Sequence, residues 1–150
     1  MNVDNVSRED WILGGIALLL IIDLLFFAWF SLSFGPVTVT STATGDPDGW
    51  LGVLAVLAAI VLIADLAIER FSPQTQLPSI NGSREQTRFV EACVVAGFLF
   101  LKFLFHIHFD LFGFGFWAAV VLTVALVYFA LQARNSGIKV ARRASSRPRR

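Results

Sequence analysis

Four long apolar stretches constrain the fold of this chain more than any other feature. They run over Trp11 to Ser33, Trp50 to Arg70, Arg88 to His108 and Phe112 to Arg134, and shorter polar segments separate them. Each can cross a hydrocarbon core of about 30 Å, for which about 20 helical residues suffice. We therefore predict an all-α fold, a polytopic antiparallel bundle of four transmembrane helices that forms one membrane domain over residues 1–134.

The composition is typical of a membrane protein. Hydrophobic residues make up 56% of the 150 residues and charged residues only 15%, whereas a soluble domain has about 25% charged residues. The first apolar stretch follows the acidic flank "NVDNVSRED" and is longer than the core of a signal peptide. We expect it to be retained, which makes the chain a multi-pass protein of the cell membrane.

The basic residues are distributed unevenly among the connecting segments. Arg8 precedes the first stretch, and Arg70, Arg84 and Arg88 border the second connection, whereas the first and third connections contain no Lys or Arg. Lys and Arg accumulate on the cytoplasmic side of membrane proteins. We therefore expect both termini to be cytoplasmic, as an even number of spans also requires.

The C-terminal segment 135–150 is a basic tail, which we predict to be disordered. In this interpretation it binds the anionic headgroups of the lipid bilayer, at about 1 kcal/mol per basic residue near the surface. No nucleic-acid-binding motif accompanies it, so nucleic acid is not expected as a partner. The basic residues of the tail are Lys139, Arg142, Arg143, Arg147, Arg149 and Arg150.

Two opposite charges are predicted to lie at a similar depth in the membrane. At 1.5 Å per helical residue, Asp23 and Lys102 both lie about 20 Å from the cytoplasmic end of their stretches. Because a charge costs roughly 2.5 to 3.5 kcal/mol at a span centre, we favour an ion pair that offsets two such costs. Two alternatives stay open. Asp23, Lys102 and His106, which shares a helix face with Lys102, would also suit a proton or ion path, and Lys102 would also reach the outer interface if it extended along the helix.

A second group of acidic residues is expected nearer the cytoplasmic side. Asp65 and Glu69 lie one helical turn apart in the second stretch, and Glu91 lies near the start of the third. Glu91 and Lys102 are eleven residues apart, which returns to nearly the same helix face. We predict that Asp65, Glu69 and Glu91 form an inner polar layer that faces the interior of the bundle.

The segment "HIHFD" contains residue types that bind zinc. His106, His108 and Asp110 would share one side only if this segment were extended, and the single cysteine, Cys93, adds no metal cluster. We predict no metal and no cofactor, with zinc at these three residues as the less favoured alternative. The chain also contains no nucleophile elbow, glycine-rich phosphate loop or HExxH motif, so an enzyme is not expected.

The segments that flank the apolar stretches contain local structural signals. Val37 and Val39 alternate with threonines, which predicts one short extended segment over the outer mouth. "SREQ", from Ser83 to Gln86, is a capping box that predicts the start of the third helix. Trp29 lies near the outer end of the first stretch, where an amphipathic ring favours the membrane interface.

Several motifs support a resemblance to a group of proteins. They are "FFAWFSLS", "ADLAIERF", "FLFLKFLFH" and "FGFGFWAAVVL". With these motifs the chain resembles small four-span integral membrane proteins of high-GC bacteria. The resemblance implies a membrane location and four spans, and it implies no particular chemistry.

We therefore predict an integral membrane protein of structural or accessory type. It would associate with itself or with another membrane protein, because no residue pattern in the chain indicates catalysis. The alternative is a small proton- or ion-coupled transporter or channel that uses Asp23, Lys102 and His106.

Overall fold

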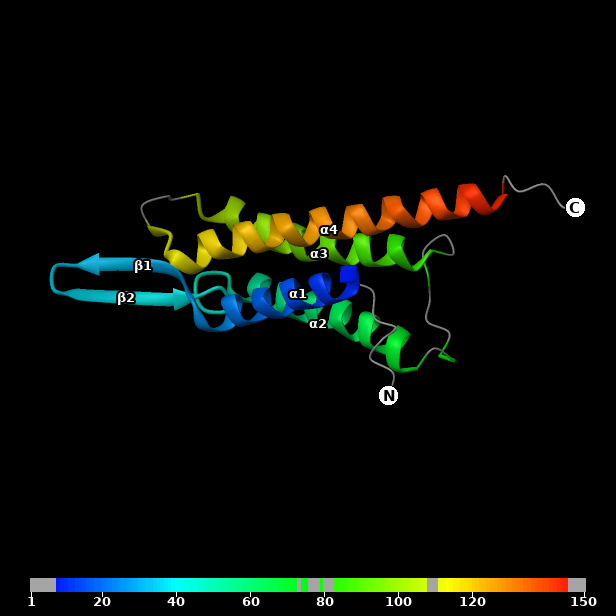
Figure 1. Cartoon of the computed structure of the whole chain (residues 1–150). Coiled ribbons are helices and arrows are strands. Elements are labelled where there is room, and N and C mark those ends of the chain that lie inside the picture. Colours follow the sequence, from blue (N-terminus) through cyan, green and yellow to red (C-terminus); the bar gives the residue numbers. More distant parts are fainter. Residues whose placement is uncertain (1–7, 73, 76–78, 80–82, 108–110, 146–150) are drawn as a thin grey trace, which may run out of the picture.

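The protein is mostly helical, with four helices and one β-hairpin. The computed structural model describes residues 8–72, 74, 75, 79, 83–107 and 111–145, and only the backbone of 138–145. The helices lie side by side along one direction, and the hairpin extends past one end of the bundle (Figure 1). In chain order the elements are α1 (Arg8–Phe26), β1 (Ala28–Phe34), β2 (Val37–Thr42), α2 (Gly49–Phe71), α3 (Arg84–Phe105) and α4 (Phe114–Ser145).

The four helices form a ring in which neighbours in sequence are neighbours in space. α1 packs against α2, α2 against α3 and α3 against α4, and α4 closes the ring against α1. The eight-residue connection between α3 and α4 favours antiparallel neighbours, as in up-and-down bundles. The buried centre consists of small and branched residues such as Ala17, Ala59, Ala92, Leu20 and Leu126. Small side chains let the helix backbones approach one another.

Two of the helices are long and apolar enough to cross a membrane. They are α2, and the part of α4 from Phe114 to Gly137. α1 and α3 fail the same test because every 18-residue window of each contains at least three charged residues. Their length is adequate, since the 19 residues of α1 give about 28 Å of helix. Whether these two helices suit a membrane therefore depends on where their charges point.

The first helix is shorter than predicted. We predicted a span from Trp11 to Ser33, but α1 ends at Phe26 and the residues from Ala28 onward form β1. The reason is local, because serines alternate with Phe30, Leu32 and Phe34, and this period of two suits a strand. Gly35 makes the turn with a φ of +62°, a conformation that glycine adopts without strain. The all-α prediction was therefore wrong for this segment.

The hairpin has one apolar face and one hydroxyl face. Strands β1 and β2 pair in antiparallel fashion, and the predicted extended segment at Val37 is the second of the two strands. Ser33 and Thr38 face each other with 3.3 Å between their hydroxyl oxygens. The apolar face comprises the cross-strand pairs Leu32 with Val39 and Phe34 with Val37, and the hydroxyl face comprises Ser31 with Thr40 and Ser33 with Thr38.

Tertiary packing places Trp29 differently from the sequence-based prediction. We expected its ring at the membrane interface, but it is only 2% exposed. Its ring makes an edge contact with Phe116 of α4, with 5.4 Å between the ring centroids. The base of the hairpin is thus part of the core, which explains how a two-stranded ribbon keeps a defined position.

Two helix boundaries test the local predictions. The Ser83 hydroxyl accepts a hydrogen bond of 3.4 Å from the backbone N–H of Gln86, which confirms the predicted cap at the start of α3. At the other end of the chain, α4 continues to Ser145. It therefore includes the first eleven residues of the segment that we predicted to be a disordered tail.

Candidate functional site

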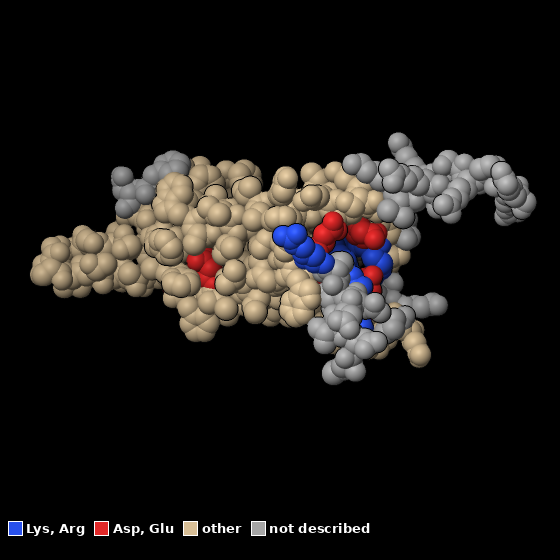
Figure 2. Space-filling view, viewed as in Figure 1, with Lys and Arg blue, Asp and Glu red and all other residues tan. Residues whose placement is uncertain are grey.

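The described charged side chains gather at two ends of the bundle. Figure 2 shows basic and acidic side chains together at the end opposite the hairpin, and a small acidic spot near the hairpin. We call the first region the ion-pair end and the second the hairpin end. The ion-pair end comprises Asp10, Asp65, Glu69, Arg70, Arg84, Arg88 and Glu91. The hairpin end comprises Asp23, Asp46, Asp48, Lys102 and His106.

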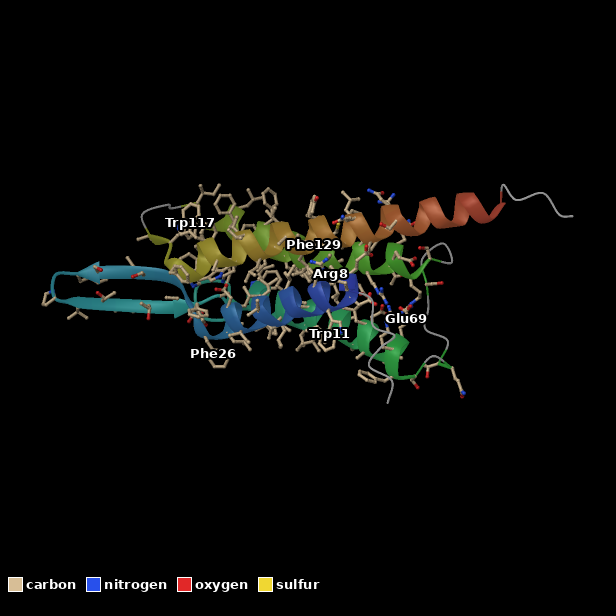
Figure 3. The ribbon with its side chains drawn as sticks, viewed as in Figure 1. Arg8, Trp11, Phe26, Glu69, Trp117 and Phe129 are labelled. Carbon is tan, nitrogen blue, oxygen red and sulfur yellow. The ribbon has the colours of Figure 1, made fainter. Side chains whose placement is uncertain are left out.

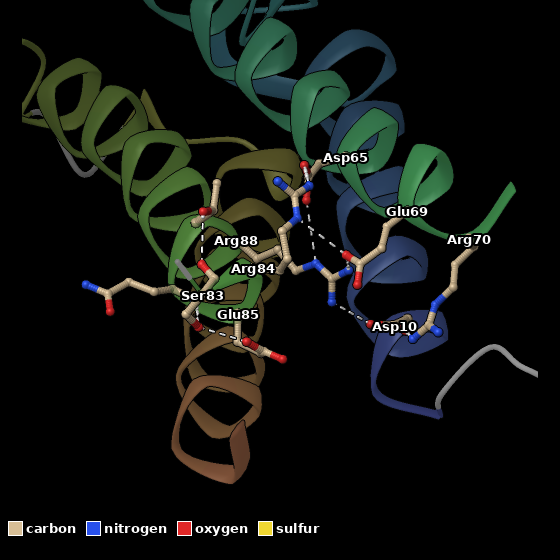
Figure 4. A network of polar contacts seen from close by, with 10 residues as sticks. Asp10, Asp65, Glu69, Arg70, Ser83, Arg84, Glu85 and Arg88 are labelled. Atoms are coloured by element: carbon tan, nitrogen blue, oxygen red, sulfur yellow. Dashed lines mark hydrogen bonds and ion pairs between the residues drawn. The ribbon is translucent and has the colours of Figure 1, made fainter. Parts of the chain in front are cut away.

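Arg88 of α3 is the centre of the ion-pair end. It is only 5% exposed, and its guanidinium contacts carboxylates from two other helices (Figure 4). Its Nη1 donates to Oδ1 of Asp10 at 2.9 Å, its Nη2 donates to Glu69, and its Nε lies 3.6 Å from Oδ2 of Asp65. The planar fork of arginine suits several oxygens at once. One side chain thus holds α1, α2 and α3 together.

Two further arginines complete this network. Arg70 of α2 donates to Asp10 of α1, and Arg84 of α3 donates to Asp65 of α2. The Nε atom of Arg84 also lies 3.6 Å from Oε2 of Glu69. Each helix pair among α1, α2 and α3 is therefore linked by at least one guanidinium. A buried charge of this kind is tolerated only when partners compensate it.

The predicted inner polar layer is brought together at this end. Asp65 and Glu69 share Arg84 and Arg88. Glu91 lies within electrostatic range of Asp65, Arg84 and Arg88, although its Oε2 is buried without a hydrogen-bond partner. The sequence reasoning missed Asp10, which occupies the first turn of α1. Counting depth from the start of each helix would have placed it beside Arg88.

Glu85 extends the network toward the first turn of α3. Burial alone would raise its pKa, but its own backbone N–H, the Ser83 hydroxyl and the charges of Arg88 and Arg84 together lower the pKa below the ordinary value of 4.5. The Ser83 hydroxyl donates to its Oε2 at 2.8 Å. The carboxylate form is therefore favoured where the third helix begins.

Lys102 is the centre of the hairpin end and is 0% exposed. Its ammonium donates to the backbone carbonyl oxygens of Pro47 at 2.6 Å and Asp48 at 3.0 Å. It also lies 5.9 Å from the ring centroid of Trp29 and 5.6 Å from that of Phe30. Aromatic faces attract a cation at such distances. Lys102 therefore binds the loop that precedes α2 and does not extend to the surface.

His106 adds a second contact from α3 to the same loop. It caps the C-terminus of α3, and its Nδ1 lies 3.6 Å from Oδ2 of Asp48. Asp48 has a positive φ of 51°, a backbone conformation that aspartate adopts more readily than most residues. Two side chains of α3 thus converge on one loop residue. Beside them lies a cavity of about 210 Å³ between the hairpin, the loop and His106.

Asp23 does not share a hydrogen bond with Lys102, although we predicted an ion pair between them. Asp23 is 2% exposed, and neither carboxylate oxygen has a hydrogen-bond partner among the described residues. The Trp29 side chain is close enough to act on this carboxylate electrostatically, but its indole N–H also lacks a hydrogen-bond partner. Asp23 and Lys102 therefore lie at the same end of the bundle with Trp29 as a common neighbour, but without a hydrogen bond between them.

An apolar layer separates the two ends. Glu91 and Lys102 are eleven residues apart on α3, about 16 Å along the helix, and Val95 and Leu99 are buried between them. On α1 the buried residues between Asp10 and Asp23 are Leu13, Ala17 and Leu20. In the part of the chain that the structure describes, the charged residues discussed above thus form two separate groups and not a continuous path.

A larger apolar groove lies between α3 and α4. Its volume is about 610 Å³, and its lining includes Phe100, Phe103, Trp117 and Val120. Thr123 supplies a hydroxyl that is buried without a hydrogen-bond partner. The groove has the apolar character of a surface that contacts lipid or another helix.

The remaining predicted residues lie outside the described part of the structure. His108 and Asp110, two of the three zinc candidates, are among them, as are Arg147, Arg149 and Arg150. Lys139, Arg142 and Arg143 belong to the backbone of α4, but their side chains are not described. Comparison with known proteins adds no family, because no family model, curated protein or solved structure matches the chain.

Proposed function

We propose that this chain is a four-span membrane protein of structural or accessory type, with both termini in the cytoplasm. Support comes from the outer surface of the bundle, where large apolar side chains are exposed on all four helices. Figure 3 shows Trp11, Phe26 and Trp117 directed away from the bundle. Contiguous apolar surface of this extent is unfavourable in water and suits a bilayer.

The charges on α1 and α3 agree with spanning because they point inward. Asp10, Asp23, Arg88 and Lys102 are all buried inside the bundle. Ionisable residues within transmembrane helices face the interior and pair with other groups. The ion-pair end, which contains Arg70, Arg84 and Arg88, then lies in the cytoplasm, and the hairpin lies on the outer side.

One observation favours a structural role over transport. The buried cations Arg88 and Lys102 are engaged in holding helices and loop together, and the apolar layer between the two ends contains buried leucine, valine and alanine side chains. An ion path needs polar groups or a water-filled cavity through the membrane. The arrangement supports a rigid scaffold that would associate with itself or with another membrane protein.

The orientation is tested by cysteine labelling on intact cells. In a Cys93→Ser background, Thr38→Cys on the hairpin should react with a membrane-impermeant maleimide, whereas Ser136→Cys on α4 should react only after lysis. Equal labelling of both sites before lysis would contradict the proposed topology.

The structural role is tested by flux in liposomes and by co-purification. Purified protein should give no proton flux above that of empty liposomes, and mild detergent should retain a partner at fixed stoichiometry. Proton flux that is lost in Asp23→Asn would instead support the second candidate, a proton-coupled transporter. The observation that favours this candidate is the buried Asp23 carboxylate, whose oxygens have no hydrogen-bond partner among the described residues.

A further inference from the structure

The hairpin extends away from the membrane in the proposed four-span arrangement, and the inference below rests on that arrangement. Its strands continue along the direction of the helices and pass the end of the bundle (Figure 1). Seven residues of β1 cover about 23 Å at about 3.3 Å per residue. The tip of the hairpin therefore lies well beyond the helices and points away from the bilayer that contains them.

One face of this hairpin exposes apolar side chains to water. Phe34 is 67% exposed, and Leu32, Val37 and Val39 are exposed as well. The opposite face carries the pairs Ser31 with Thr40 and Ser33 with Thr38. A two-stranded hairpin is marginally stable in water without a packed face. A hairpin that binds a partner through one face needs an apolar face for the contact and a polar face toward water, and this hairpin has both.

The apolar face continues into the cavity at its base. Leu32 and Val39 line the 210 Å³ cavity together with Pro47, His106 and Leu111. We call this combined surface, from Phe34 and Val37 at the tip to the cavity, the hairpin face. It offers both a flat strip and a hole of side-chain size, and such holes are the usual sites of energetic anchors in protein interfaces.

The rim of the hairpin face is acidic. Asp46 lines the cavity and is exposed, and Asp48 lies next to it with a partly exposed side chain. Lys102 is the one Lys or Arg between Arg88 and Arg134, and none occurs from residue 9 to residue 69. Lys102 acts on both carboxylates from a fully buried position, so among the described residues the rim has no exposed Lys or Arg.

We propose that the hairpin face binds an apolar segment of a second protein that carries a basic residue at its end. The apolar strip would cover the segment, and the acidic rim would attract the basic residue. A second copy of this chain fits less well, because a symmetric interface brings the same patch against itself. That arrangement would place one acidic rim against another. The bilayer of the protein itself is excluded by the direction of the hairpin.

The test is photo-crosslinking from single positions in native membranes. Benzoylphenylalanine replaces Phe34 or Val39 on the apolar face, and Ser33 or Thr38 on the hydroxyl face serves as the matched control on the same ribbon. We expect an adduct of one defined mass from the apolar positions, at least fivefold stronger than from the controls. Peptide mass spectrometry of the adduct should identify an apolar segment with a Lys or Arg.

Charge reversal at the rim tests the second half of the proposal. Asp46→Lys should reduce the adduct from Val39 at least threefold, and Asp46→Asn should reduce it less. Glu9→Lys, an exposed change of equal charge at the ion-pair end, should leave it unchanged. Thermal unfolding in detergent checks that the Asp46→Lys variant is folded. If it is unfolded, the adduct yield of Asp46→Asn tests the role of the acidic rim.

Several outcomes would overturn the inference. They are an adduct of twice the chain mass, which indicates a second copy, adducts to lipid alone, equal adducts from both faces, or no adduct at all. These results are separable from the proposed function. Failure of Thr38→Cys to react on intact cells would contradict the proposed topology. Proton flux in liposomes would contradict the proposed structural role, but it would not contradict binding at the hairpin face.

Discussion

The two ends of the bundle bury charge in two different ways. At the ion-pair end, Arg88 meets carboxylates from two other helices. At the hairpin end, Lys102 meets two backbone carbonyls and two aromatic rings. In the first case opposite side-chain charges compensate each other. In the second case the cation binds backbone carbonyls of a loop, and the nearby carboxylates of Asp48 and Asp46 in the same loop also act on it. Lys102 therefore organises a loop and not a helix pair.

The different contacts of Arg88 and Lys102 indicate a different structural role for each end. Ion pairs between helices hold the bundle in register, because each partner belongs to a different helix. Carbonyls bound by a lysine hold a loop, here the one that joins the hairpin to α2. Loss of one arginine should therefore weaken the whole bundle, whereas loss of the lysine should loosen the hairpin end first.

The largest effect is expected for Arg88→Met. The substitution leaves Asp10, Asp65 and Glu69 without their shared cation, and breaking a buried pair costs about 3–5 kcal/mol. The free energy of unfolding in detergent measures this loss. Arg134→Met is the matched control, since the guanidinium of the half-buried Arg134 lies 5.1 Å from the Phe89 ring centroid and such a contact contributes about 0.5–2 kcal/mol. An equal loss in the free energy of unfolding for both variants would contradict the central role of Arg88.

A smaller and more local effect is expected for Lys102→Met. The carbonyls of Pro47 and Asp48 lose their donor, which costs about 1–3 kcal/mol for buried groups. Hydrogen exchange should rise first at Leu51, whose N–H donates to the Asp48 carbonyl at 3.1 Å. Leu101→Met, at the exposed neighbour on α3, is the control. Uniform loosening across all four helices would show that the two ends are not separate.

Double-mutant cycles sharpen the comparison between the ends. Asp10→Asn with Arg88→Gln should give a coupling energy of about 0.5–3 kcal/mol, because the two side chains are in contact. Asp23→Asn with Lys102→Met should give a smaller coupling energy than the first pair, because these two side chains share no hydrogen bond and only have Trp29 as a common neighbour. A large coupling for the second pair would restore the Asp23–Lys102 ion pair as the main contact.

The smallest effect concerns acid and Glu85. Its pKa is lowered below 4.5 in the folded protein, so the carboxylate contributes stability that is fully present above pH 4.5 and is lost as the pH falls through the lowered value. Glu85→Gln should therefore unfold at a temperature that depends less on pH below about pH 5 than that of the wild type. Identical acid profiles for the two proteins would contradict this contribution.

Much of the fold follows from local patterns, and the misses have physical reasons. The cap at Ser83 and the cores of α2, α3 and α4 were predictable because they depend on neighbouring residues. The end of α1 was missed because "FFAWFSLS" is apolar enough for a membrane span, and hydropathy outweighed its period of two. The burial of Trp29 was missed because its partner Phe116 is far along the chain.

The candidate sites also contain residues whose partners could be predicted from the sequence and residues whose partners could not. Asp65, Glu69 and Glu91 were expected together, and they lie together because helical periodicity and depth are countable from sequence. The partners of Lys102 were not countable, since backbone carbonyls carry no sequence signal. Those carbonyls belong to Pro47 and Asp48, in the loop before α2.

Three properties follow from the amino-acid sequence alone: the high content of apolar residues, the positions of most helices and the uneven distribution of basic residues. These properties depend on side-chain solubility, helical period and local capping, which act over a few neighbouring residues. The tertiary structure decided which charges meet, how the loop before α2 binds Lys102, and where the hairpin points. Those outcomes depend on segments that are up to 78 residues apart, as Asp10 and Arg88 are, and only the closed ring of four helices brings them into contact.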